Sequence, residues 1–285
     1  MRLFSGTGPP GDEEALERAI GYARRGGNGR AALEATVWLL FTLTTLRVPA
    51  DVALGRAEQA LAEADSDPWE QAAIHQTFAP LYAYMGRFAE ARAALARSRA
   101  LRAKSGAGFD WAIAAWPAGL IEMIAGDAAG AERELRGGYE ALGAMGERAY
   151  RASIAAMLAD AVYAQGRLAE AQDLADEARE IAASGDIDAH VRWRAITAKL
   201  LACRGQFPAA RKLADEALAL IPGRTTGPLR AEMLVANAEV LQLAGAPREA
   251  GDCLRQALAI YTDRHAVPLA ERTRAALASL DTQPG

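Results

Sequence analysis

Cysteine is scarce in this sequence: its 285 residues include only Cys203 and Cys253, which lie 50 positions apart. Neither belongs to a Cys-x-x-Cys pair or to the Cys/His spacing of a zinc site, so no disulfide framework and no zinc motif is indicated. We therefore expect a protein of a reducing compartment, the cytoplasm, with no metal and no cofactor.

An excess of positive charge is also missing. The formal net charge is −4, with 32 Lys and Arg against 36 Asp and Glu. Binding to phosphate backbones or anionic lipid requires basic surfaces, so we expect no nucleic-acid partner and no membrane partner. The longest apolar stretch, residues 38–46, contains three Thr and is far shorter than the ~20 residues of a membrane-spanning helix.

Residues that favour β-strands are few. Ala accounts for 69 residues, about half of the hydrophobic ones, whereas aromatic residues amount to only 6% and Val, Ile and Thr are sparse. This composition excludes a β-rich fold and favours an all-α protein.

One short pattern recurs along the chain: Gly, a polar or small residue, two spacer residues, an acidic or small residue, and Ala. Successive copies are separated by 40, 40, 39 and 40 residues, a register that random placement of 26 Gly would not maintain. The five copies begin at Gly86, Gly126, Gly166, Gly205 and Gly245. Because Gly ends helices in the left-handed conformation without a steric penalty, the pattern predicts helical hairpins with these Gly at the turns.

Small residues recur at fixed distances from these turns and would let neighbouring helices approach closely. Seven positions before each Gly come Ala79, Gly119, Ala159, Ala198 and Ala238, and twelve after it come Ser98, Gly138, Ala178, Ala217 and Ala257. A first turn near residues 46–49, a preceding helix over 12–25 and a capping helix over 268–280 complete about six hairpins. We expect a flexible leader over residues 1–11 and a single repeat domain over 12–285.

These positions resemble the tetratricopeptide repeat (TPR), and the ending Glu216-Ala217-Leu218 followed by Pro222 matches it best. The resemblance implies a right-handed superhelical solenoid in which the first helix of each hairpin lines a concave face. The usual TPR period is ~34 residues, so each unit here carries about six extra residues.

Two runs, residues 198–218 and 238–261, are similar to the C-terminal repeats of bacterial multidomain signalling proteins. In those proteins a class III nucleotide cyclase or a LuxR/MalT-type DNA-binding domain is joined to a signalling ATPase. Residues 261–265 depart from the Lys-Gly turn of that group. The chain contains no GxxxxGK[ST] loop, so the resemblance covers the repeats alone.

Charged residues alternate along the predicted concave face. In the TPR pattern, the residues six and thirteen before the turn Gly point into the groove, which here are Asp160, Lys199 and Glu239, and Ser153, Arg192 and Glu232. Opposite charges on successive repeats predict an ion-pair ladder between hairpins. The alternative is a clamp in which Arg192 and Lys199 hold a carboxylate or phosphate.

Large rings are concentrated in the second and third hairpins, where residues 69–116 hold eight of the 18 aromatic residues. The same register directs Gln76, Tyr84, Trp116 and Met123 into the groove, and Tyr163 is assigned to it as well. Rings with polar edges beside a flexible thioether form anchor surfaces for peptides. The alternative is that these rings fill a wide gap between repeats.

Motifs that carry catalysis are absent. Residues 6–11 match GxGxxG, but no strand precedes them and Pro9 and Pro10 supply no N–H for a pyrophosphate. Asp186 and His190 could be read as metal ligands, although Asp186 or Asp188 is better explained as a helix cap. We therefore expect no enzyme.

The sequence favours a non-catalytic scaffold or regulatory module of bacterial signalling that binds a protein or peptide. One alternative is a small-molecule sensor whose superhelix encloses a ligand and signals to an attached effector. A weaker alternative is an enzyme with its active site in the groove. The sequence is compatible with a homo-oligomer.

Overall fold

The computed structural model describes residues 13–45, 47–63, 68–103, 108–221 and 227–281 of the chain. Within these ranges the chain forms fifteen helices and no strand, which confirms the all-α prediction. None of these helices is long and apolar enough to cross a membrane. The predicted leader, residues 1–11, lies outside the described residues.

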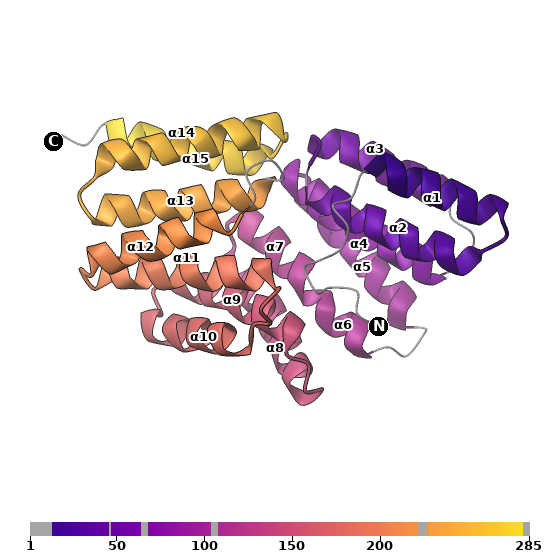
Figure 1. Cartoon of the computed structure of the whole chain (residues 1–285), viewed down its shortest axis with the longest axis horizontal. Helices are drawn as coiled ribbons and strands as arrows, with labels where there is room; N and C mark the ends of the chain where they lie inside the picture. Colours follow the sequence, from indigo (N-terminus) through magenta and orange to yellow (C-terminus); the bar gives the residue numbers. More distant parts are fainter. Residues whose placement is uncertain (1–12, 46, 64–67, 104–107, 222–226, 282–285) are drawn as a thin grey trace.

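The helices follow one another as a solenoid of six hairpins (Figure 1). The hairpins are α2 (Gly29–Thr44) with α3 (Ala50–Glu63), α4 (Pro68–Tyr84) with α5 (Phe88–Ala103), α7 (Ala115–Ala125) with α8 (Ala128–Ala144), α9 (Ala149–Tyr163) with α10 (Leu168–Ile181), α11 (Ile187–Cys203) with α12 (Phe207–Ala219), and α13 (Pro228–Leu243) with α14 (Pro247–Asp263). The predicted flanking helices are α1 (Glu13–Arg25) and α15 (Val267–Asp281). The short helix α6 (Gly108–Ile113) was not expected from the repeat.

All five predicted turn Gly lie between the helices of a hairpin, with φ angles of 73° to 82°. This left-handed conformation closes the first helix and reverses the chain, so the forty-residue register is confirmed. The small residues of the register are buried between helices, as at Ala159 and Ala198. Ser98 is also buried, and its hydroxyl donates to the Ala72 carbonyl at 2.7 Å.

The turn between α14 and α15, where the sequence departs from the Lys-Gly pattern, holds His265 with a φ of 54°. A residue with a Cβ adopts this conformation at a cost of roughly 1–2 kcal/mol. The His265 ring offsets that cost with a contact that Gly could not make, because its Nδ1 lies 2.7 Å from Asp51 Oδ1 in α3. The turn that differs from the Lys-Gly pattern thus provides, through His265, a contact between the two ends of the solenoid.

The solenoid closes on itself, because its C-terminal helices return to its first hairpins (Figure 1). The Ala50 amide donates to the Arg264 carbonyl at 3.0 Å, and Arg272 Nη1 donates to the Met123 carbonyl at 3.0 Å. One hydrophobic cluster runs from Ile20 in α1 to Ala270 in α15. The last helix, α15, therefore contacts α4 and α7 on the concave side. We use the name recess for the part of the concave side that carries Asp160, Arg192, Lys199, Glu232 and Glu239.

Outside the recess, an ion-pair network joins the third and fourth hairpins. Glu132 of α8 accepts hydrogen bonds from Arg136 and Arg167, both at 2.6 Å, and from Gln165 at 2.8 Å. The bonds from Arg167 and then Arg136 lower the pKa of Glu132 to about 2. The carboxylate is accordingly held charged across most of the pH range in which proteins fold.

We expect Glu132→Gln to lower the free energy of unfolding by about 1–2 kcal/mol at pH 7, allowing for screening by solvent. A carboxyl whose pKa falls on folding adds stability above its unfolded pKa, near 4.5, and that contribution is lost as the pH falls toward 2. The difference between variant and wild type should therefore shrink between pH 5 and pH 3. Urea denaturation at these pH values, with exposed Glu180→Gln as control, measures it; an unchanged difference at pH 3 would contradict the network's role.

Candidate functional site

The concave recess contains a row of charges contributed by three successive hairpins. Lys199 of α11 forms an ion pair with Asp160 of α9, and its Nζ also lies 3.7 Å from Glu239 Oε2 of α13. Both carboxylates are within the ~4 Å limit of an ion pair. The predicted ion-pair ladder is therefore confirmed for Asp160, Lys199 and Glu239.

An aromatic ring and a thiol extend this row. The Tyr163 hydroxyl donates to Glu239 Oε1 at 2.5 Å and lies 3.4 Å from the sulfur of Cys203. The Lys199 ammonium lies 4.3 Å from the centre of the Tyr163 ring, a cation–π arrangement. Burial, followed by the contacts with Cys203 and Glu239, raises the pKa of Tyr163, so the phenol remains a hydrogen-bond donor.

A second row of charges lies in the same recess, around Arg192, which precedes Lys199 by seven residues on α11. Arg192 of α11 donates from Nε to Asp188 at 2.9 Å and from Nη1 to Glu232 of α13 at 2.7 Å. Burial opposes the charge of Arg192, but Asp188 and Glu232 together outweigh it and raise the Arg192 pKa. Burial raises the pKa of Glu232, and Arg192 opposes this shift only in part.

The two rows leave negative charge in excess, since four carboxylates surround two cations. The Arg192 and Lys199 side chains are each 10% exposed, whereas the side chains of Asp160, Asp188, Glu232 and Glu239 are 30% to 39% exposed. Of the charged side chains in the two rows, the acidic ones are therefore the more exposed to solvent. The alternative clamp required free cations, and this geometry does not provide them.

The predicted aromatic anchors differ in position from the expectation. Tyr84 is only 5% exposed, because α4 is covered by the returning C-terminal helices, and burial raises its pKa. Its ring is therefore part of the core, and the expectation of an exposed Tyr84 is corrected. Trp116 and Met123 are half-buried and pack against the same core. Gln76 is half-buried, and its Oε1 receives no hydrogen bond from any described residue.

Sequence reasoning did not find every residue of the recess. Asp188 had a detectable signal, because it lies four positions before Arg192 on the same helix, the spacing of an intrahelical ion pair. Arg272 had none. It reaches the end of α7 only because the solenoid closes, and it donates there to a backbone carbonyl of the helix C-terminus.

The alternative metal reading of Asp186 finds no support in the described part of the chain. Asp186 Oδ1 accepts a hydrogen bond from the Ala189 amide at 3.0 Å, so Asp186 is the N-cap of α11. No group of three or more His, Cys, Asp or Glu side chains suited to a metal ion occurs among the described residues.

Comparisons with known proteins agree with a TPR-type helical solenoid. No protein-family model and no curated protein sequence matches the chain. The fold is similar to that of NprR in complex with its cognate peptide NprX, with a TM-score of 0.60 and 12% identity over 94% of this chain and 81% of that one. The apo quorum sensor NprR from B. thuringiensis gives a TM-score of 0.53 with 11% identity, over 94% and 78% of the two chains.

A third similar structure is the APC/C hetero-tetramer Cut9-Hcn1, with a TM-score of 0.60 and 15% identity over 95% of this chain and 47% of that one. At these identities the likeness concerns the fold. The chain thus has the architecture of TPR solenoids, which host many different functions.

Proposed function

We propose that this chain is a non-catalytic, cytoplasmic scaffold or regulatory module that binds a protein or peptide in its concave recess. The observation that carries the proposal is the excess of partly exposed carboxylates around the paired Arg192 and Lys199. Such a surface favours a partner segment that carries Lys, Arg or a free amino terminus, because the added cation restores charge balance.

Two further features support binding of a chain segment. The NprR solenoid, which is similar in fold, was solved with its cognate peptide. The Tyr163 hydroxyl and the carboxylates of the recess are hydrogen-bonding groups along a line of successive helices, and they could engage successive groups of an extended peptide. The resemblance of residues 198–218 and 238–261 to the repeats of bacterial signalling proteins supports a role in signalling.

The test is binding to an array of random 12-residue peptides, with Kd values then measured by fluorescence anisotropy. We expect the wild-type protein to retain Lys- and Arg-rich peptides, and the double variant Glu232→Gln/Glu239→Gln to bind them about tenfold more weakly. The matched control is Glu140→Gln/Glu180→Gln, which removes the same charge from exposed positions. Equal loss in both variants, or retention of acidic peptides by the wild type, would contradict the proposal.

A further inference from the structure

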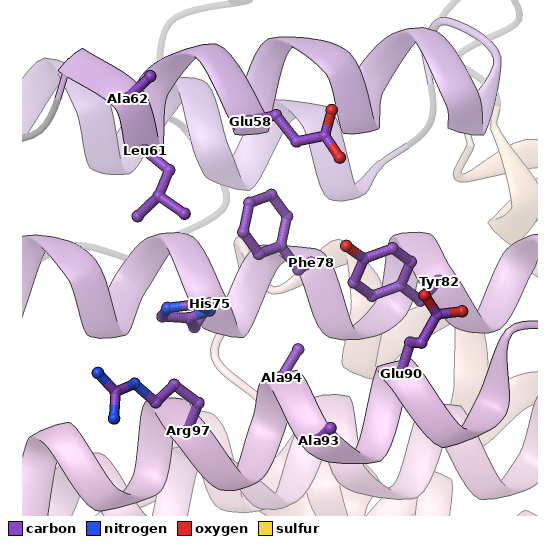
Figure 2. Close-up of a pocket in the computed structure, with 10 residues that line it drawn as sticks. All are labelled: Glu58, Leu61, Ala62, His75, Phe78, Tyr82, Glu90, Ala93, Ala94 and Arg97. Carbon is purple, nitrogen blue, oxygen red and sulfur yellow. The ribbon is translucent and has the colours of Figure 1, made fainter.

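A groove lies on the first two hairpins (Figure 2). It runs between α3 and α5, which are the second helices of their hairpins, and α4 forms its floor. The cavity has a volume of about 600 Å³. None of its lining residues belongs to the two rows of the recess.

The floor and walls of the groove are apolar at their centre. Phe78 and Tyr82 of α4 form the floor, with ring centres 5.9 Å apart, and Leu61 and Ala93 contribute from the two sides. At one end the His75 ring meets Phe78 edge to face at 5.6 Å. Burial, and then the neighbouring Arg97, lower the pKa of His75, so this ring is neutral at pH 7.

Opposite charges mark the two ends of the groove. Arg97 lies beside His75 at one end, and Glu58 lies beside Tyr82 at the other, together with Glu90 (Figure 2). Glu90 is paired with Arg87, whereas Glu58 and Arg97 form no ion pair within the described ranges. On α5 the two ends are seven residues apart, at Glu90 and Arg97, which corresponds to ~10 Å along a helix.

We propose that this groove binds one amphipathic helix of a partner protein. The helix would place apolar side chains over Phe78 and Tyr82, an acidic residue beside Arg97, and a basic residue two turns away at the end of the groove that holds Glu90 and Glu58. A helix offers this spacing directly, because residues i and i+7 lie on one face ~10 Å apart. Docking of an apolar helix face in a groove between helices is an established mode of recognition.

The charges allow a test in which specificity should switch. The probes are three stapled, fluorescein-labelled 14-residue helical peptides with the same Leu face and with Glu/Lys, Lys/Lys or Glu/Glu at positions i and i+7. We expect the wild-type protein to bind the Glu/Lys peptide about three- to fivefold more tightly than the others. Arg97→Glu should shift the preference to Lys/Lys, and Glu58→Lys to Glu/Glu.

Two further variants separate this groove from the recess. Ala93→Trp adds a ring at an exposed wall position, and it should abolish binding of all three peptides while the melting temperature stays near that of the wild type. The recess variant Glu232→Gln/Glu239→Gln should bind them as the wild type does. Absence of peptide binding, one preference shared by wild type, Arg97→Glu and Glu58→Lys, or unchanged binding to Ala93→Trp would overturn the proposal.

Discussion

Replacing Arg192 by Met is expected to lower the free energy of unfolding by about 2–4 kcal/mol, which is less than the ~3–5 kcal/mol for removing one partner of a fully buried ion pair because the side chains of Asp188 and Glu232 are partly exposed. The Arg192 side chain is 10% exposed, and its guanidinium donates hydrogen bonds to Asp188 and Glu232. Without it, two carboxylates face each other in a recess where burial already raises the pKa of Glu232. The loss should appear in urea denaturation at pH 7.

The pH dependence of this variant has a defined sign. A carboxyl whose folded pKa lies above its unfolded value loses stability as the pH rises from the unfolded pKa, near 4.5, through the folded one. The deficit of Arg192→Met should therefore be larger at pH 7 than at pH 4.5. The triple variant Arg192→Met/Asp188→Asn/Glu232→Gln removes the charges together and should recover most of the stability; a triple variant no better than the single one would refute this explanation.

Replacing Gly138 by Ala is expected to lower the free energy of unfolding by about 2–3 kcal/mol, although Ala has the better helix propensity. A Cβ at this position would lie 2.2 Å from the Ala115 Cβ and 2.8 Å from the Ala112 carbonyl oxygen. Since one of these atoms is backbone, α8 would have to move away from α6 and α7. Thermal and urea denaturation of the variant measure the effect.

The chain supplies a matched control at Gly55 in α3, where an added Cβ would meet no atom within 4 Å. Gly55→Ala should raise the free energy of unfolding by about 0.5–1 kcal/mol, through helix propensity alone. If Gly138→Ala were as stable as Gly55→Ala, the close approach of α8 to α6 and α7 would not be what requires Gly at position 138.

The repeat itself was predictable because its signals are local. The preference for Gly at a turn depends only on the positive φ of that residue. The preference for a small residue at a fixed distance from the turn depends only on contact with the neighbouring helix of the same hairpin. The row of Asp160, Lys199 and Glu239 was also predictable from the forty-residue repeat, because adjacent repeats place equivalent positions side by side. Composition and period together determined an all-α solenoid with these turns.

Only the tertiary structure decided what covers the concave side. Each repeat adds a small rotation that no single sequence position encodes, and the sum over six hairpins brings α15 to α4 and α7. That closure buries Tyr84, places Arg272 at the end of α7 and brings His265 to Asp51, across 214 positions of sequence. The groove over Phe78 and Tyr82 likewise depends on the separation of α3 and α5, which is a property of helix packing rather than of sequence period.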